Sequence, residues 1–313
     1  MKKYIILITT LVLLLTGCTQ LKEYNKNLFF MDTYINIKVY MNNPKQAKKI
    51  LDGASKIYEK YQKITNKYDL DSEVSKINAN LTHQVSDELY EMLELGSTWY
   101  DKSDGLFNIN MGNLIDVWKN HKENDGKLPS PEELNIEIKK IELRNKKVYS
   151  NNLDLGAIAK GFTTQKVADY FKKNNIKYYL INAGGNILAG ENESRGYYKI
   201  GIEDPTDKTK VYSVVKGENI SVVTSGGYER FFQVDGVNYH HIIDPFTKYP
   251  ATNMLSVTVV SNDSGLADIL STTLFLMEPN KAISLIETIP NTEAIIYINK
   301  DQILKSSGYS KYE

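Results

Sequence analysis

The chain has 313 residues, of which 42% are hydrophobic and 24% charged, a composition typical of a globular protein with a substantial core. Its 38 basic and 38 acidic residues balance, which argues against a nucleic-acid binder that depends on a strong basic field. The single cysteine, Cys18, excludes an internal disulfide bond.

The first 18 residues have the pattern of a bacterial export signal. Lys2 and Lys3 precede an apolar stretch over residues 4–15, which is too short to span a membrane comfortably. The sequence LTGC that follows resembles a lipobox, the signal whose cysteine is lipidated after cleavage just before it. An ordinary secretory peptide is the alternative, but the only cysteine lies where the lipobox requires it. We therefore expect a signal peptide over residues 1–17, a lipidated tether over residues 18–27, and anchoring of the domain 28–313 at the extracytoplasmic face of the cell membrane.

The elements predicted along the remaining chain mix helices and strands. Residues 28–40 alternate and predict a strand, and apolar residues at three- and four-residue steps predict a helix over 44–64. Residues 120–134 are polar and rich in Gly and Pro, so they predict a surface loop. Further helices are predicted over 87–100, 160–174, 265–277 and 280–288, with strands at 177–182, short strands within 197–260, and a hairpin over 293–304. Because regular β-α-β alternation is missing, the predicted class is α+β, with mixed sheets and packed helices and no Rossmann domain.

Two glycine-bearing turns carry polar side chains. In DLGAIAKG (154–161), small residues at the predicted helix start would let backbone N–H groups approach an anion, and Lys160 could meet a phosphate as a point charge. A plain strand-to-helix turn is the alternative. The paired glycines of NAGGN (182–186) suit a tight turn as well as a ligand loop, and they do not form a GxGxxG fingerprint.

Two of the four histidines, His240 and His241, are adjacent. His241 lies three residues before Asp244, and a histidine with a nearby carboxylate is a general-base arrangement. A zinc site is the competing interpretation, but the segment lacks cysteine partners and the chain lacks an HExxH motif. A structural histidine satisfied by hydrogen bonds remains a third interpretation.

Asp268 and Thr272 are four residues apart and share one face of a mostly apolar predicted helix. An ionised aspartate in such surroundings needs a partner. Carboxylate and hydroxyl oxygens are hard ligands that suit Mg²⁺, which also binds phosphates. The alternative is a cap-like bond between Asp268 and a backbone N–H.

In their order along the chain these motifs resemble the FAD:protein FMN transferase family, also called ApbE. The resemblance covers nearly everything after residue 28. It rests on MDT (31–33), DSEVSKIN (71–78), GLFN (105–108), DLGAIAKG (154–161), INAGGNI (181–187), TSGGYER (224–230), HIIDP (241–245) and ADILST (267–272). A lipobox ahead of such a domain is common in this family.

The resemblance implies an ApbE-like fold and an enzyme that splits the pyrophosphate of FAD. FMN would pass to a threonine or serine of an extracytoplasmic acceptor flavoprotein, and AMP would be released. By the same resemblance, Mg²⁺ is held by Asp268, Thr272 and the carbonyl of Ala157, and His241 is the base or orienter, supported by Asp244. The residues implied in FAD contact are Met31, Tyr68, Leu106, Phe107, Asn108, Asp154, Lys160 and Ile242.

The chain departs from the family pattern at three positions. Many relatives carry Asp where this chain has Asn108 and Asn186, which leaves a second metal or an extra ligand there in doubt. Asp32 stands where glycine is common. Two alternatives to a transferase remain: an FAD pyrophosphatase that uses water as acceptor, and a flavin-binding lipoprotein without catalysis.

Overall fold

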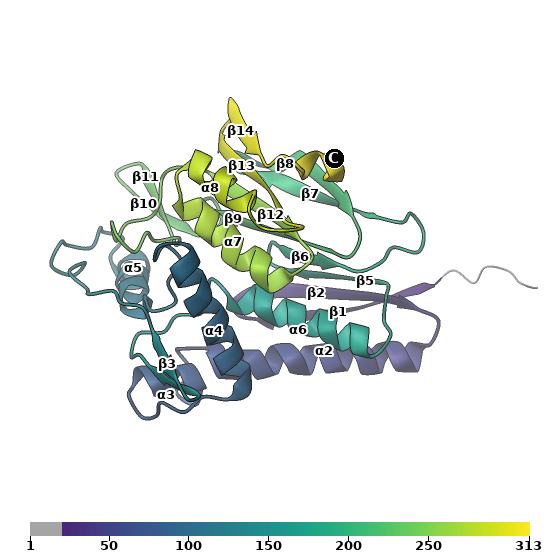
Figure 1. Ribbon diagram of the computed structural model, residues 1–313, viewed down its shortest axis with the longest axis horizontal. Coiled ribbons are helices and arrows are strands. Elements are labelled where there is room, and N and C mark those ends of the chain that lie inside the picture. The colour runs from purple at the N-terminus through teal and green to yellow at the C-terminus, as the bar shows by residue number, and fades with distance from the viewer. Residues whose placement is uncertain (1–20) are drawn as a thin grey trace, which may run out of the picture.

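An eight-stranded antiparallel sheet organises the protein (Figure 1). The computed structural model describes residues 21–313, so the predicted signal peptide and Cys18 lie outside the described residues. The strands follow the order β1-β2-β5-β6-β9-β12-β13-β14. Their bounds are β1 Lys22–Phe30, β2 Thr33–Met41, β5 Tyr179–Ala183, β6 Asn186–Ala189, β9 Ile220–Gly226, β12 Ser256–Ser261, β13 Glu293–Asn299 and β14 Gln302–Lys305.

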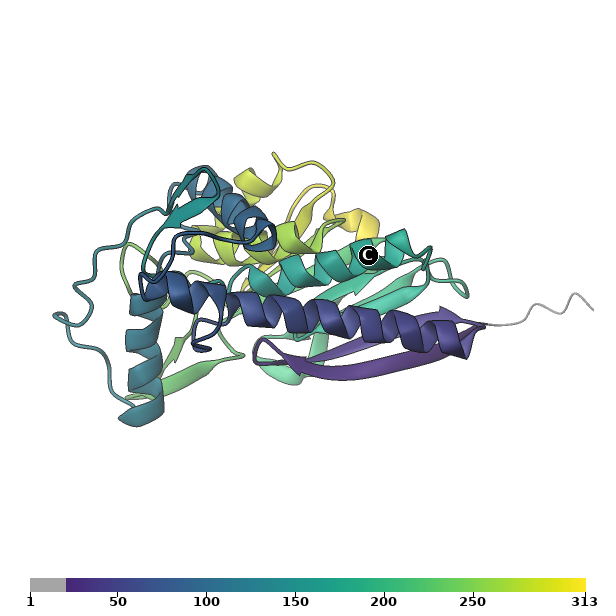
Figure 2. The same ribbon diagram turned by 90° about the horizontal axis from the view of Figure 1, so that it is seen from below.

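Helices cover one face of this sheet. Helix α2 (Pro44–Thr65) and helix α6 (Ala159–Lys173) lie side by side against β1, β2 and β5, as Figure 2 shows from below. Helix α7 (Ser264–Leu276) packs on β9 and β12 and is buried along most of its length. Helix α8 (Pro279–Ile286) follows it. The hydrophobic core between the sheet and these helices is thus built from residues within 21–313.

The opposite face is covered by a hairpin of β7 (Tyr198–Asp204) and β8 (Asp207–Gly217), with the short 3-10 helix η1 (Tyr309–Tyr312). Strand alternation separates the two layers. On β9, Val223 faces the helical layer and Val222 faces the hairpin. The α+β class expected from sequence is confirmed.

A second group of elements lies at one end of the sheet (Figure 1). It comprises α3 (Glu73–Asn78), α4 (Asp87–Lys102), α5 (Gly112–Asn124), the hairpin of β3 (Glu142–Arg144) and β4 (Lys147–Tyr149), and the hairpin of β10 (Phe231–Val234) and β11 (Val237–His240). Asn78 ties this group to the segment leading into α6, because its amide nitrogen donates to the carbonyl of Leu153 at 2.9 Å and its amide oxygen accepts from the Leu153 N–H at 2.7 Å.

Most predicted helices and the closing hairpin are confirmed, with ends that shift by one or two residues. Helix α2 begins where predicted because the Asn43 side chain accepts from two backbone N–H groups and Pro44 occupies the first helical turn. The predicted loop over 120–134 is wrong in its first five residues, which complete α5. That helix buries Leu114 and Trp118 among polar neighbours, so its apolar stripe is too sparse to stand out.

The predicted strand over 28–40 is two strands joined by a tight turn at Met31 and Asp32. Both residues have φ of 53°, the left-handed conformation required at the centre of a type I′ hairpin. This conformation explains why glycine suits the position of Asp32. Because β1 already begins at Lys22, residues 22–27 belong to the sheet and not to the expected tether.

Within residues 21–313, no helix combines the length and the apolar character needed to cross a membrane.

Gly161 should be the least replaceable glycine of the α6–α7 junction. A methyl group there would lie 2.4 Å from the Asp268 Cβ and 2.4 Å from the Ser264 carbonyl. We expect Gly161→Ala to lower the free energy of unfolding by about 1–3 kcal/mol, measured by chemical denaturation. Gly265→Ala, where the nearest atom lies at 3.3 Å, is the control and should change it by no more than about 0.5 kcal/mol. Equal losses in both variants would contradict the packing described.

Candidate active site

A buried carboxylate lies where α6 meets α7. The Asp268 side chain is 4% exposed; one of its oxygens accepts from the Gly161 backbone N–H at 2.7 Å, and the other lies 3.7 Å from the Lys160 Nζ. Burial raises the pKa of Asp268 above its ordinary value, and Lys160 and the Gly161 N–H only partly oppose this rise. The cap-like bond weighed from sequence therefore exists, and it leaves the carboxylate short of positive charge.

The bond to Asp268 also frees a carbonyl. In a regular helix the Gly161 N–H would donate to the carbonyl of Ala157, four residues earlier. Here it donates to Asp268, and among the described residues the Ala157 carbonyl accepts no hydrogen bond. A backbone acceptor without a partner is thus left at the start of α6, close to an under-compensated carboxylate.

Thr272 lies one helical turn beyond Asp268 and is half-buried. Its hydroxyl lies 3.4 Å from the Ser225 hydroxyl of β9, which bonds Ser271 at 2.8 Å. The described residues contain no group of three or more His, Cys, Asp or Glu side chains placed to hold a metal. One carboxylate together with neutral hydroxyl and carbonyl oxygens does fit Mg²⁺, which binds few protein ligands and keeps others from water and phosphate.

The two asparagines that depart from the family pattern make local bonds. The Asn108 side chain accepts from the Asn110 N–H at 2.8 Å. Asn186, 1% exposed at the start of β6, accepts from the Ser264 hydroxyl at 2.8 Å, while its amide nitrogen has no partner among the described residues. Asn186 thus fixes the start of α7 without adding negative charge to the Asp268 site.

The adjacent histidines have different environments. His240 is a structural histidine: Nε2 lies 2.7 Å from the Ala251 carbonyl, Nδ1 accepts from the Ile242 N–H at 3.2 Å, and the ring packs edge-on against Phe275. Both ring nitrogens are therefore in use. Burial lowers the pKa of His240 below its ordinary value, which keeps the ring neutral.

Among residues 21–313, one ring nitrogen of His241 has no hydrogen-bond partner. Its Nδ1 lies 3.3 Å from the Arg230 carbonyl, and because a carbonyl only accepts, Nδ1 carries the proton and Nε2 keeps its lone pair. The residue is exposed at the surface, but the body of the protein beside the ring removes part of its hydration. This desolvation, followed by the cations of Arg230 and then Lys160, holds the pKa of His241 well below its ordinary value. Lys160 thus acts on both His241 and Asp268.

Arg230 connects this histidine to the β1–β2 turn. Its guanidinium donates to the Asp32 carbonyl at 2.8 Å, and its own carbonyl accepts from the backbone N–H of His241 as well as from the ring. Met31, in the same turn, donates its backbone N–H to the Gln62 side chain at 2.7 Å. The predicted residues Met31 and His241 are therefore linked through a side chain that the sequence reasoning missed.

Three predicted roles need correction. Asp244 does not hold His241 in the structure: its carboxylate accepts from the N–H groups of Phe246 and Thr247 and so caps its own turn. Ile242 and Phe107 are 7% and 1% exposed and pack in the main core. Those two side chains offer little or no surface to a ligand, whereas Leu106 and Asn108 are half-buried.

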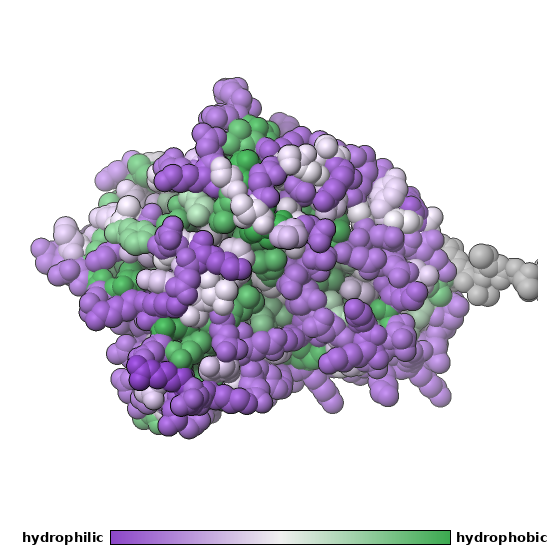
Figure 3. Space-filling view, in the orientation of Figure 1, coloured by the Kyte–Doolittle hydropathy of each residue, from purple (hydrophilic) through white to green (hydrophobic). Residues whose placement is uncertain are grey.

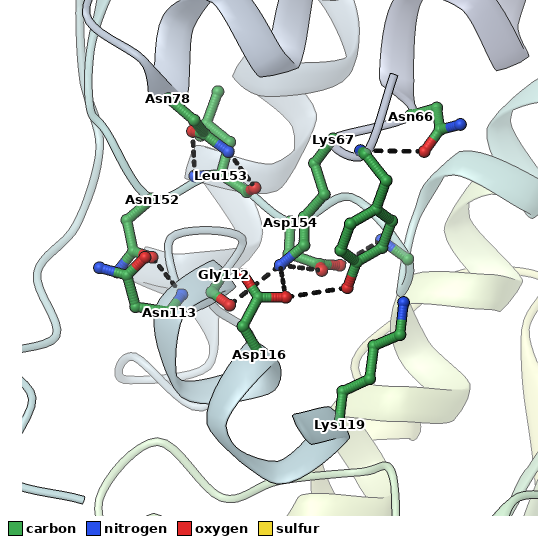
Figure 4. Close-up of polar contacts among 12 residues, drawn as sticks. Asn66, Lys67, Asn78, Gly112, Asn113, Asp116, Lys119, Asn152, Leu153 and Asp154 are labelled. Carbon is green, nitrogen blue, oxygen red and sulfur yellow. Dashed lines mark hydrogen bonds and ion pairs between the residues drawn. The ribbon is translucent and has the colours of Figure 1, made fainter. Parts of the chain in front are cut away.

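A network of charges surrounds Asp154 (Figure 4). The Lys67 side chain, 7% exposed, lies 3.2 Å from Asp154 and 2.8 Å from Asp116, and it donates to the Gly112 carbonyl at 2.9 Å. Tyr68 donates its hydroxyl to Asp116 at 2.9 Å, and the Lys119 ammonium lies 3.6 Å from its ring centre. Tyr68 and Asp154, each implied separately in FAD contact, are thus brought together by Lys67 and Asp116.

These connecting residues carry weak sequence signals. Lys67 is one of 35 lysines, the 38 basic residues less three arginines, and nothing in the local pattern marks it as buried. Arg230 is one of those three arginines and lies within the TSGGYER motif, so its rarity could have marked it as a candidate site residue.

A sequence model of the ApbE family matches residues 31–296, and this match decides the family. The chain belongs to the ApbE family. The FAD:protein FMN transferase of Treponema pallidum is 29% identical, over 93% of this chain and 89% of its own length. That of Klebsiella pneumoniae is 30% identical, over 91% of this chain and 92% of its own.

Solved ApbE structures share the fold. The ApbE protein of Thermotoga maritima superposes with a TM-score of 0.83 at 27% identity, covering 93% of this chain and 99% of its own. The flavin transferase ApbE of Vibrio cholerae gives 0.82 at 25% identity, covering 94% and 100%. The family resemblance inferred from the motifs is confirmed.

We expect Lys67→Met to disrupt the network around Asp154. It would leave two carboxylates and a carbonyl without their shared cation, lowering the free energy of unfolding by about 1–3 kcal/mol in chemical denaturation. Lys119→Met, which removes a partly exposed lysine from the same neighbourhood, should change it by less than about 0.5 kcal/mol. A Lys67 variant as stable as the Lys119 variant would show that the network is not structurally important.

Proposed function

We propose that this ApbE-family chain is a Mg²⁺-dependent FAD:protein FMN transferase that modifies an extracytoplasmic acceptor flavoprotein. One observation carries the proposal: a metal-compatible group of oxygen atoms and a neutral histidine share the field of one lysine. The buried Asp268 carboxylate lies 3.7 Å from the Lys160 ammonium, which only partly offsets its charge. The same ammonium helps to keep His241 neutral. Relatives named FAD:protein FMN transferase, matched over most of their length, support it.

His241 supplies the base. Its free Nε2 accepts the proton of the acceptor threonine or serine hydroxyl, while the Arg230 carbonyl holds the ring through Nδ1. The hydroxyl oxygen forms a bond to the phosphorus of the FMN half of FAD. The bond between this phosphorus and the bridging oxygen breaks, and AMP leaves with that oxygen. The products are an FMN phosphoester on the acceptor and AMP.

Asp268, Thr272 and the Ala157 carbonyl would hold Mg²⁺, which, when bound, supplies positive charge to the pyrophosphate and the leaving AMP. Lys160 adds a further cation beside Asp268. The protein's contribution is therefore chiefly positioning and charge neutralisation, as phosphoryl transfer requires.

The other exposed or half-buried predicted residues would bind FAD. Tyr68 is about half exposed and offers an aromatic surface fixed by Asp116. Asp154 offers a carboxylate held by Lys67. Leu106 and Asn108 follow Gly105 in the chain, and the turn at Gly105 approaches Phe246 of the loop after His241. Met31 is half-buried in the turn that Arg230 binds.

Lipidation at Cys18 would anchor this domain at the extracytoplasmic face of the membrane. The lipobox resemblance supports this part of the proposal, and the start of the sheet at Lys22 leaves only a short segment between anchor and domain.

A pyrophosphatase would use the same site with water in place of the acceptor, so one assay separates the alternatives. The body comprising residues 21–313 is incubated with FAD, Mg²⁺ and an acceptor that carries a flavinylation threonine. A mass gain of one FMN with stoichiometric AMP, lost in EDTA, is the result expected for the transferase. AMP without a mass gain would favour the pyrophosphatase. FAD binding without either product would favour the binding lipoprotein.

Asp268→Asn should separate catalysis from folding. Its amide oxygen can still accept from the Gly161 N–H, but the charge that would hold Mg²⁺ is gone. We expect transfer to fall by at least about a hundredfold, while the free energy of unfolding stays equal or rises, because an uncompensated buried charge is removed. Full Mg²⁺-dependent transfer in this variant would refute the metal assignment.

The pH profile should reveal the base. A histidine must be neutral to accept a proton, and because the folded pKa of His241 is depressed, we expect transfer to persist below pH 6.5, the ordinary histidine pKa. Arg230→Gln removes a neighbouring cation, so the pKa of His241 and the acid limb of the profile should both move to higher pH. Arg230→Lys keeps the charge and should restore the limb.

Histidine NMR titration of the same variants checks this assignment directly. An unchanged His241 titration in Arg230→Gln would contradict the electrostatic coupling.

A further inference from the structure

Six exposed lysines cluster at one end of the molecule, away from the site just described. Three lie in the first two turns of α2, two in the last turn of α6, and one at the start of β1: Lys45, Lys48, Lys49, Lys172, Lys173 and Lys22. We call this set the lysine end. Within residues 21–313, none of the six forms a salt bridge with a described carboxylate.

A hollow of about 470 Å³ opens between the two helices at this end. It is lined by Lys45, Lys48, Lys49 and Lys56 of α2 and by Tyr170 of α6. The one carboxylate in its lining, Asp52, is already paired with Lys26 at 2.6 Å. The hollow therefore presents several ammonium groups to a bound anion with little internal compensation.

The strand register places the lysine end beside the predicted anchor. Lys22 pairs with Met41, and α2 begins three residues later, at Pro44. Figure 1 and Figure 2 both show the start of β1 and the first turns of α2 at the same end. Cys18 is only three residues before Leu21, a span of at most about 10 Å in an extended chain.

Figure 3 shows a predominantly hydrophilic surface over α2, at the lower edge of the view. The surface therefore does not suit insertion into the hydrocarbon of a bilayer. It suits contact with charged head groups, because ammonium groups closer to a surface than the screening length, about 8 Å at physiological salt, still attract its charges.

We propose that the lysine end binds the anionic head groups of phospholipids and so fixes the orientation of the enzyme on its membrane. This inference rests on the lipid anchor in the proposed function. Each lysine near an anionic surface strengthens partitioning by about fivefold. Several lysines beside the anchor therefore add an electrostatic attraction to the attachment that the acyl chains give, and this attraction acts on one side of the domain only.

The orientation has a consequence for the active site. Strands β1 and β2 each run nine residues from the lysine end to the Met31–Asp32 turn, a distance of about 30 Å. Arg230 binds that turn and holds His241. In the docked enzyme, His241 thus lies about 30 Å from the lysine end, where an acceptor domain can approach it.

Vesicle binding of the body comprising residues 21–313 tests the charge recognition without the anchor. We expect sedimentation with vesicles of phosphatidylcholine and phosphatidylglycerol, none with phosphatidylcholine alone, and release in about 1 M salt, where the screening length falls to about 3 Å. The triple variant K45Q/K48Q/K49Q should bind at least about tenfold more weakly. The control K122Q/K127Q/K281Q removes the same charge from exposed lysines outside the lysine end and should bind as the unmodified body does.

Equal weakening in both triple variants, or equal binding to neutral and anionic vesicles, would overturn the proposal. If the unmodified body does not sediment with anionic vesicles at any lipid concentration, the proposal is also overturned. Flavin transfer measured on the same samples separates this result from the proposed function, since none of the six substituted lysines belongs to the catalytic machinery.

Orientation is tested with the anchor in place. Because Cys18 is the only cysteine, residues 18–313 can be coupled through it to a maleimide lipid. Amine labelling read by mass spectrometry should then show Lys45, Lys48 and Lys49 protected on anionic vesicles and labelled on neutral ones. Equal labelling on both would show that the tether alone sets the attachment and would contradict the proposed orientation.

Discussion

The site depends on one buried ionic contact, the carboxylate of Asp268 against the start of α6. Gly161 must lack a side chain for the two helices to approach this closely, and its N–H turns from the regular helical acceptor to the carboxylate. That single bond leaves the Ala157 carbonyl free and brings Lys160 to 3.7 Å from the second carboxylate oxygen. The desolvation of Asp268 is incompletely offset, which favours a cation at this point.

Arg230 makes the second contact that organises the site, between the β1–β2 turn and His241. Arg230 holds the β1–β2 turn with its guanidinium and His241 with its carbonyl, so the geometry of His241 depends on a strand at the edge of the sheet. The same guanidinium helps to keep the ring neutral. Structure and electrostatics therefore favour one tautomer with Nε2 available.

The sequence was sufficient for the elements with strong periodicity or clear capping, such as α2 and α7, and for the family through its ordered motifs. It missed α5, whose buried residues are separated by polar ones, and it merged β1 with β2, since the turn carries Met and Asp where Gly or Asn would signal a hairpin. It singled out Asp268 and His241, and it expected Asp244 to support His241, where the structure has the Arg230 carbonyl beside the ring. Contacts between residues distant in sequence, such as Lys67 with Asp154, leave no local pattern.

Direct measurement of metal binding tests the central claim, that the Asp268 junction holds a divalent cation. Mn²⁺ can replace Mg²⁺ and be followed by electron paramagnetic resonance in the body comprising residues 21–313 with FAD and no acceptor. We predict one protein-dependent Mn²⁺ site whose affinity falls at least about tenfold in Asp268→Asn, a variant that keeps the bond to Gly161. Unchanged Mn²⁺ affinity in a folded Asp268→Asn protein would contradict the account and place the metal elsewhere.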